Sequence, residues 1–259
     1  MDIKDWEKIS NSFVGKRIQI EERSIARQEL RKLFGKIVVQ IGGNSDFPII
    51  SGALAPHKIQ VAESNLEPNR HCHLVNAEFG NLPFGSESVD ICVLQHSLEY
   101  CDSPHQVLRE AVRILRPGGR LLVFGFNPRS LWRFRLKNGV FSQSKIGWWK
   151  GLLSERRIED WFRLLQLEPE CTRYSLYYLP LENNKIRRFF YKTEQAIQRS
   201  NWPVGGVYCI RARKERVQWI FQSQQMRFLN SVRATRGITK PAIGFKRRNT
   251  LRIVRKTEG

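Results

Sequence analysis

Three short segments, each directly after an apolar run, carry groups that could bind a nucleoside. Gly42 and Gly43 follow the first run, and because they have no Cβ the backbone there can approach a ligand closely. Glu63 follows the second run, twenty-one residues after Gly42, where an acid hydrogen-bonds the two ribose hydroxyls in nucleotide-binding α/β folds. Asn76, Ala77 and Glu78 follow the third run, and amide and backbone groups there can bind the edge of a purine. Together these residues predict a nucleoside site.

Several better-known sites are not present in the sequence. From Gly42 the chain reads G-G-N-S-D-F, which does not satisfy the dinucleotide fingerprint G-x-G-x-x-G, and no G-K-[S/T] of a Walker A loop follows a strand. His71, Cys72 and His73 can bind metals, but no second ligand pair stands at a fitting spacing, so we predict no metal site. A serine hydrolase has no support either, since the G-x-S-x-G elbow is missing.

The segments that must position these residues alternate between short apolar runs and helix-length stretches. Such alternation is typical of βαβ units and a mostly parallel sheet, in which ligands bind beyond the carboxyl ends of the strands. The expected strands are 37–41, 58–62, 74–75, 89–94, 120–126, 171–179 and 207–212. The expected helices are 18–34, which Gly35 would end, 104–115 and 158–166, each with apolar residues at helical spacing. We expect Arg116 to Gly119 to form a turn that ends the helix 104–115.

The net charge of +20 is concentrated at the C-terminal end. Residues 216–259 hold eleven Lys and Arg and one acid, so a sixth of the chain carries half of the net charge. Such a segment either contacts nucleic acid or another polyanion, or is a solvated tail that only aids solubility. We therefore expect three parts: an N-terminal helical segment (1–34), a domain (35–215) and a basic C-terminal extension (216–259).

The remaining composition predicts a cytoplasmic protein with a substantial core. Hydrophobic residues make up 41% of the 259-residue chain, which argues against wholesale disorder. The five cysteines are odd in number and widely spaced, as expected of reduced thiols in an intracellular protein. No apolar run approaches the roughly 18 to 20 residues of a membrane span, and the N-terminal residues show no secretory signal.

One block, residues 76–126, is far more specific than any single site. It contains Asn76-Ala77, Leu82-Pro83-Phe84, Val89-Asp90-Ile91-Cys92, Leu98-Glu99-Tyr100 and Leu115-Arg116-Pro117-Gly118-Gly119. In type and spacing these motifs resemble those of the class I S-adenosylmethionine-dependent methyltransferases, in the type-11-like branch that reads D-A-x-x-L-P-F, F-D-x-V, L-E-H and L-R-P-G-G. Weaker matches extend the resemblance over about residues 35–215. Two further segments are similar to those of an uncharacterised proteobacterial subgroup of this family: Gly125-Phe126-Asn127-Pro128 and Gly205-Gly206-Val207-Tyr208.

The resemblance implies a Rossmann-like α/β fold: a seven-stranded sheet with helices on both faces and the last strand antiparallel. It implies S-adenosyl-L-methionine as cofactor, above the first four strands. Gly42 would lie under the methionine part of the cofactor, Glu63 would hold the ribose, and Asn76 and Ala77 would contact adenine. Gln95 and His96 would close the site from the fourth strand. The cofactor-binding residues that we predict are Gly42, Gly43, Glu63, Asn76, Ala77 and Gln95.

The first motif of the family is altered in this chain. Where members read D-h-G-x-G-x-G, this chain has Gln40, Gly42, Asn44 and Asp46, so the acid has become an amide and only one of the three glycines aligns. Asp46 places a Cβ and a charge where a bare backbone is expected. Cofactor affinity is therefore the property that this departure most affects.

Methyl transfer from a sulfonium is an in-line displacement, for which a protein mainly positions donor and acceptor. A dedicated base is needed only if the acceptor is protonated at the working pH. His96 is the candidate catalytic residue, and the alternative is that it packs against or hydrogen-bonds the next helix. Tyr100 and His105 are further candidates that also fit a structural loop before a helix.

Two functions from different classes follow. The first is a methyltransferase with an unidentified acceptor, for which the resemblance favours a small molecule. The alternative is a methyltransferase-like fold that has lost catalysis and binds nucleic acid through residues 216–259, motivated by the altered glycine motif and the basic charge.

Overall fold

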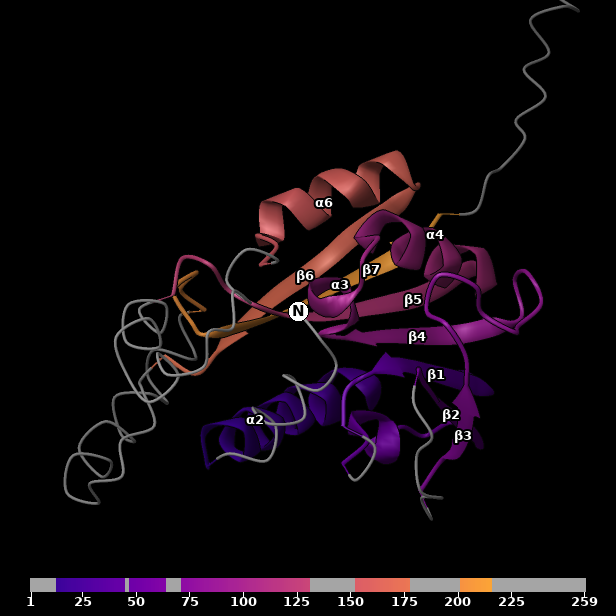
Figure 1. Ribbon diagram of the computed structural model, residues 1–259, viewed down its shortest axis with the longest axis horizontal. Helices are drawn as coiled ribbons and strands as arrows, with labels where there is room; N and C mark the ends of the chain where they lie inside the picture. The colour runs from indigo at the N-terminus through magenta and orange to yellow at the C-terminus, as the bar shows by residue number, and fades with distance from the viewer. Residues whose placement is uncertain (1–12, 45–46, 64–70, 131–151, 178–200, 216–259) are drawn as a thin grey trace, which may run out of the picture. The chain divides into compact units, whose positions relative to one another are not determined.

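The structure is a computed structural model that describes residues 13–44, 47–63, 71–130, 152–177 and 201–215 (Figure 1). The chain divides into two units, Met1–Val217 and Gln218–Gly259. The second unit and the whole of the predicted basic extension, 216–259, lie outside the described residues. None of the helices in the described ranges is long and apolar enough to cross a membrane.

A seven-stranded sheet in the order β3-β2-β1-β4-β5-β7-β6 forms the centre of the first unit (Figure 1). The strands are β1 (Ile37–Gly42), β2 (His57–Ala62), β3 (His73–Asn76), β4 (Val89–Gln95), β5 (Leu115–Phe126), β6 (Leu167–Ser175) and β7 (Val207–Lys214). β7 runs antiparallel to both of its neighbours, whereas β1 to β5 pair in parallel. The predicted fold class, with its antiparallel last strand, is thereby confirmed.

Helices cover both faces of the sheet (Figure 1). α2 (Phe13–Leu30) and the 3-10 helix η1 (Ile49–Gly52) lie on one face, and α4 (Pro104–Ile114) and α6 (Glu155–Leu164) on the other, while the one-turn helix α3 (Ser97–Tyr100) follows β4. Along β5, Leu121 and Val123 pack in the core with α4 and α6, whereas Leu122 and Phe124 pack in the core with α2. Because both faces are covered, the strand is apolar at successive positions.

The first described helix differs from its prediction at both ends. α2 covers Phe13–Leu30 instead of 18–34, and Phe34, the last residue of the predicted helix, has 83% of its surface exposed. The chain must turn after Leu30 to enter β1, and the N–H groups of Lys36 and Ile37 donate to Oδ2 of Asp90 at 2.6 and 2.9 Å. The helical spacing of the residues after Leu30 is therefore fortuitous.

The buried carboxylate of Glu29 ties α2 to the last two strands. Its side chain accepts from Lys32 at 2.9 Å and pairs with Arg173 of β6 at 2.5 Å and with Arg211 of β7. Burial alone raises the pKa of Glu29, but the three cations outweigh it and hold the pKa below its usual value. These ion pairs join α2 to β6 and β7, so the helix and the sheet form one folded unit.

The boundaries of two further strands were predicted wrongly. β6 is Leu167–Ser175 rather than 171–179, because it begins almost directly after α6. β5 begins at Leu115, so the segment from Arg116 to Gly119 lies within the strand instead of forming a turn. The register between β4 and β5 shifts opposite this segment, and Gly118 has a φ of +82°, so the glycines accommodate an irregularity in the strand.

Candidate functional site

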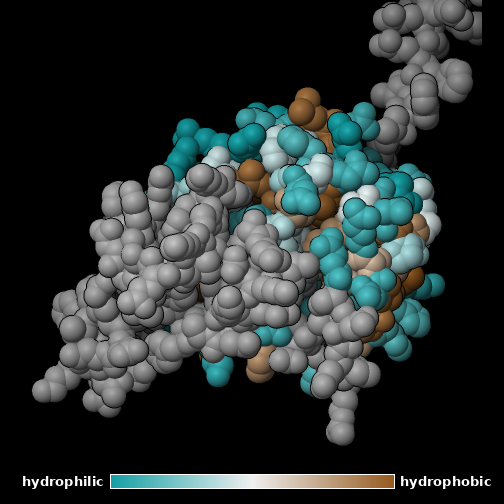
Figure 2. All heavy atoms as spheres, in the orientation of Figure 1, coloured by the Kyte–Doolittle hydropathy of each residue, from teal (hydrophilic) through white to brown (hydrophobic). Residues whose placement is uncertain are grey.

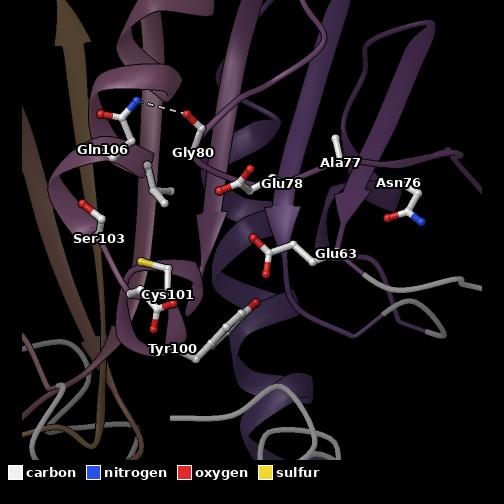
Figure 3. Close-up of a pocket in the computed structure, with 11 residues that line it drawn as sticks. Glu63, Asn76, Ala77, Glu78, Gly80, Tyr100, Cys101, Ser103 and Gln106 are labelled. Carbon is white, nitrogen blue, oxygen red and sulfur yellow. Dashed lines mark hydrogen bonds between the residues drawn. The ribbon is translucent and has the colours of Figure 1, made fainter.

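A pocket of about 660 Å³ opens at the edge of the sheet where β2 and β3 end (Figure 3). Its walls come from Glu63 after β2, from residues between 76 and 80 after β3, and from residues between 100 and 107 at α3 and the beginning of α4. Gln106 donates from Nε2 to the carbonyl oxygen of Gly80 at 3.1 Å, which joins the last two walls. Pockets of this volume are typical for small ligands.

Three of the predicted cofactor-binding residues line this pocket: Glu63, Asn76 and Ala77. The carboxylate of Glu63 points toward the side of Tyr100 (Figure 3), and its Oε1 accepts from the backbone N–H of Phe79 at 3.0 Å. β2 and β3 are parallel neighbours, so Ala62 and Asn76 pair directly and bring their following residues to one edge. The structure thus brings these three residues to one pocket, and the binding of the cofactor by them stays a prediction.

Gly42 and Gly43 lie behind the wall formed by Tyr100 rather than in the lining of the pocket. Both have positive φ values, +79° and +81°, a conformation that side chains with a Cβ rarely adopt. Gly43 donates its N–H to the hydroxyl oxygen of Tyr100 at 3.2 Å. A Cβ on Gly42 would collide with that hydroxyl, and a Cβ on Gly43 would collide with the side-chain amide of Gln95. The glycines are therefore required by the packing of the protein's own side chains.

Gln40 is fully buried and stands where the family that the chain resembles has an acid. Its contacts explain why an amide fits here. Its Nε2 donates to the carbonyl oxygen of Gly42 at 3.0 Å and to Oε1 of Gln95 at 2.9 Å. Its Oε1 accepts the N–H of Ile49 at 3.0 Å, at the beginning of η1. A carboxylate could accept from Ile49 but could not donate to Gly42, so the amide suits this glycine turn better than the acid would.

Gln95 was expected to close the site from β4, but the structure does not bring its side chain into the pocket lining. It is completely buried, and its Nε2 donates to Oε2 of Glu22 in α2 at 2.7 Å. The reason is the alternation of the strand: Gln95 shares the face of Ile91 and Val93, which pack in the core with α2. The sequence indicated the correct strand end, but not which face this side chain takes.

His96 is buried and held between two carboxylates. Its Nδ1 lies 2.7 Å from Oε2 of Glu99, its Nε2 lies 2.5 Å from Oε1 of Glu22, and its ring stacks on Phe126 at 4.2 Å. Burial by itself lowers the pKa of His96, but the two carboxylates outweigh this and raise it to about 10. Since His96 is outside the pocket lining and both ring nitrogens contact carboxylates, the structure favours the alternative role, hydrogen bonding to the next helix.

Sequence reasoning missed several residues of the pocket wall. Cys101 and Asp102 line it together with Glu63 and Glu78, which the strand ends had indicated, and no Lys or Arg is among the described residues of the lining. Burial first, and then the nearby Glu63 and Asp102, raise the pKa of the Cys101 thiol to about 11. Burial likewise raises the pKa of Tyr100 well above its usual value. Both groups stay protonated near neutral pH, so they can donate hydrogen bonds but cannot act as bases.

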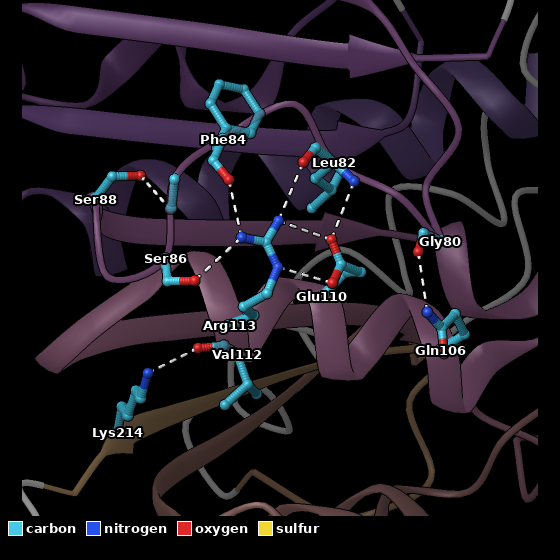
Figure 4. Close-up of polar contacts among 11 residues, drawn as sticks. Gly80, Leu82, Phe84, Ser86, Ser88, Gln106, Glu110, Val112, Arg113 and Lys214 are labelled. Carbon is cyan, nitrogen blue, oxygen red and sulfur yellow. Dashed lines mark hydrogen bonds and ion pairs between the residues drawn. The ribbon is translucent and has the colours of Figure 1, made fainter.

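The motif residues 82–84 fasten the loop that leads out of the pocket (Figure 4). Arg113 of α4 donates to the carbonyl oxygens of Leu82 at 3.0 Å and Phe84 at 2.9 Å. Arg113 also pairs with Glu110, whose Oε2 accepts the N–H of Leu82 at 3.1 Å. This arrangement holds the loop after β3 against α4 and thereby fixes two walls of the pocket.

The described part of the chain holds no group of His, Cys, Asp and Glu that could bind a metal ion.

Comparisons with known proteins agree with this architecture. Residues 46–123 match a family model described as a methyltransferase domain. An uncharacterized protein of Escherichia coli, YafS, is 31% identical over 137 residues, which are 53% of this chain and 55% of that protein. The chloroplastic 2-methyl-6-phytyl-1,4-hydroquinone methyltransferase of Arabidopsis thaliana is 28% identical over 138 residues, 49% of this chain and 38% of that protein. The chain thus spans about half the length, or less, of these two relatives.

Solved structures show the same fold at low sequence identity. A SAM-dependent methyltransferase of Thermotoga maritima, described as a possible histamine N-methyltransferase, has a TM-score of 0.53 and 19% identity, covering 80% of this chain and 99% of that chain. A SAM-dependent methyltransferase of Aquifex aeolicus has a TM-score of 0.54 and 12% identity, covering 83% and 99%. At such identities the agreement concerns the arrangement of strands and helices.

Proposed function

We propose that the chain is a class I S-adenosylmethionine-dependent methyltransferase and that it transfers a methyl group from S-adenosyl-L-methionine to a small-molecule acceptor. The observation that supports the proposal most is the pocket at the ends of β2 and β3, which is lined by Glu63, Asn76 and Ala77. An acid and an amide at one strand edge suit a ribose and a purine.

The residues of the pocket fit the proposed methyl donor. Glu63 keeps one carboxylate oxygen fixed by the N–H of Phe79, so the carboxylate is oriented to accept from ribose hydroxyls. When bound, S-adenosylmethionine would supply a methyl group on a positively charged sulfur. The carboxylates of Glu63, Glu78 and Asp102 favour a ligand of that charge.

Neither His96 nor Tyr100 nor Cys101 is suited to act as a base in the pocket. His96 lies outside the lining, and the Tyr100 hydroxyl and the Cys101 thiol both have raised pKa values. We therefore propose that the protein acts by holding donor and acceptor in line, which suits an acceptor atom that carries a lone pair at the working pH. A catalytic role for His96 is not part of this proposal.

A small-molecule acceptor is supported by the Arabidopsis thaliana relative, whose name describes a hydroquinone as its acceptor. The matches above give no support to the alternative of a catalytically inactive nucleic-acid-binding protein. Contact with nucleic acid through residues 216–259 stays a proposal motivated by charge alone. A cytoplasmic location is likewise a proposal, supported by the five cysteines, which are all free thiols.

The test is isothermal titration with S-adenosylmethionine and S-adenosylhomocysteine. We expect binding in the micromolar range, about −8 kcal/mol, for the wild-type protein. Glu63→Ala should weaken it roughly hundredfold, because the charged acceptor of the ribose hydroxyls is lost. Glu168→Ala, which removes an exposed carboxylate of β6 outside the pocket lining, is the matched control. Equal affinity in the Glu63 variant would remove the site assignment, and no wild-type binding at millimolar cofactor would contradict the proposed function.

A further inference from the structure

A carboxylate from outside the matched region lies beneath the proposed site. Glu22 belongs to α2, which precedes β1 and also precedes the residues 46–123 that match the family model. Its side chain is completely buried, although ionised groups rarely are unless they are paired. It therefore needs strong partners, and the structure supplies two from the end of β4.

The two oxygens of this carboxylate serve two different branches. Oε2 accepts from Nε2 of Gln95 at 2.7 Å, and Gln95 in turn accepts from Gln40, which also donates to the carbonyl oxygen of Gly42. Oε1 contacts Nε2 of His96 at 2.5 Å. The first branch therefore leads from α2 to the glycine turn after β1.

The second branch leads from α2 to the wall of the pocket. His96 has a left-handed backbone conformation, φ +55°, directly before α3, and its Nδ1 contacts Glu99 at 2.7 Å. Glu99 also accepts the N–H of Phe126 at 2.6 Å, which fixes α3 against the end of β5. The next residue is Tyr100, whose hydroxyl accepts from Gly43 and whose side chain lines the pocket. The two branches thus meet again where Tyr100 contacts the glycine turn.

We propose that Glu22 is a positioning residue of the methyl-donor site: by binding Gln95 and His96 together, it fixes the glycine turn and Tyr100 in the arrangement that the pocket requires. This inference rests on the proposed function, because it takes the pocket to be the site of the methyl donor. The helix before β1, α2, is then needed for the arrangement of the site. Neither Glu22 nor His96 touches the ligand, and each acts through Tyr100 and the glycine turn.

The charges of the cluster make the proposal testable. The titratable groups that face His96 are Glu22 from α2 and Glu99 from α3, and its ring packs on Phe126 of β5. With a carboxylate at each ring nitrogen, His96 is an imidazolium that donates from both. A glutamine at position 22 could still accept from Gln95 and could donate to His96, but only if Nε2 of His96 carries no proton. Glu22→Gln should therefore keep the hydrogen bonds and neutralise the imidazole.

Three variants separate positioning from general stabilisation. Glu22→Ala removes both hydrogen bonds, Glu22→Gln replaces them, and Glu21→Ala is the matched control. Glu21 is the neighbouring acid of the same helix, but it pairs with Arg17 at 2.7 Å and accepts from Ser175 at 3.4 Å. Fluorotyrosine labelling reports on Tyr100 by fluorine NMR, with the signal assigned by Tyr100→Phe. Nitrogen NMR of labelled histidine reports the protonation of His96.

We expect Glu22→Ala to shift the fluorine signal of Tyr100 and to weaken S-adenosylmethionine binding roughly tenfold or more, the effect of losing charge-assisted buried hydrogen bonds. Glu22→Gln should restore most of the affinity and show Nε2 of His96 without its proton, whereas Glu21→Ala should change neither signal nor affinity. A folded Glu22→Ala protein with the wild-type Tyr100 signal would overturn the proposal.

Two further outcomes have defined meanings. If Glu22→Ala does not fold, Glu22→Gln decides, and a His96 that stays doubly protonated there overturns the proposed contact. If the wild-type protein binds no S-adenosylmethionine, the proposed function fails, but the NMR signals of Tyr100 and His96 still decide whether Glu22 positions them.

Discussion

Replacing Gly42 by alanine tests how the glycine turn is packed against the pocket wall. Gly42 has a φ of +79°, and holding a residue with a Cβ in this left-handed conformation costs about 1–2 kcal/mol. The added Cβ would also overlap the hydroxyl of Tyr100 and would lie 2.8 Å from the carbonyl oxygen of Gln95. Overpacking of this kind costs typically about 1–3 kcal/mol. We therefore expect Gly42→Ala to lower the free energy of unfolding by roughly 2–5 kcal/mol.

Removing the hydroxyl of Tyr100 should relieve part of this penalty. Tyr100→Phe alone loses the hydrogen bond from the N–H of Gly43 and should cost about 1 kcal/mol. In that background the Cβ of Gly42→Ala no longer meets the hydroxyl, although the backbone strain and the contact with Gln95 remain. The double variant should therefore be more stable than the sum of the single effects by roughly 1–2 kcal/mol.

Urea denaturation of the four proteins, followed by tryptophan fluorescence and extrapolated linearly to water, measures this coupling. Gly85→Ala is the control, because a Cβ there meets no atom within 4 Å. The control should leave the free energy of unfolding within about 0.5 kcal/mol of the wild type. If the effects of Gly42→Ala and Tyr100→Phe add within about 0.5 kcal/mol, the hydroxyl does not pack on Gly42 and the reasoning is refuted.

Two further predictions concern buried charges. Asp90→Asn should lower the free energy of unfolding by about 2–3 kcal/mol, because this carboxylate accepts the two N–H groups at the entry to β1. Asp160→Asn is the control in the same urea assay: it lies at an exposed ion pair and should change the free energy of unfolding by less than about 0.5 kcal/mol. The pKa of His96 is raised from 6.5 to about 10 in the folded protein, so its stabilisation is complete below about pH 6.5 and is lost as the pH rises toward 10. The free energy of unfolding should therefore fall over this range more steeply in the wild type than in Glu22→Gln, and parallel pH profiles would contradict the charged state of His96.

The strands of the parallel sheet were predictable because their apolar runs are short and end at recognisable residues. The ends of the apolar runs also located Glu63, Asn76 and Ala77 at one strand edge, and the structure brings them into one pocket. The end of α2 was not predictable, because Phe34 continues the helical spacing by chance. The contact between His96 and Glu22 was not predictable either, since only the folded chain brings α2 beneath β4.

The face that each polar side chain takes was the other unpredictable feature. Gln95 and His96 are neighbours at the end of β4, and sequence reasoning assigned both to the site. The pleat of the strand turns Gln95 toward α2, and the left-handed conformation of His96 turns that side chain toward Glu22 as well. A strand end can be read from the sequence, but the direction of its last side chains depends on backbone angles that no motif encodes.

The ion pairs of Glu29 have a consequence for the order in which the chain acquires its structure during synthesis. α2 is made early, but the two arginines that neutralise its buried carboxylate, Arg173 and Arg211, come from the last strands. An isolated helix of 18 residues is only marginally stable in water, and a carboxylate that is paired with Lys32 alone opposes its burial. We therefore expect α2 to pack stably on the sheet only after residue 211 has been synthesised. A chain stalled before that point would expose the apolar face of α2 to chaperones and proteases.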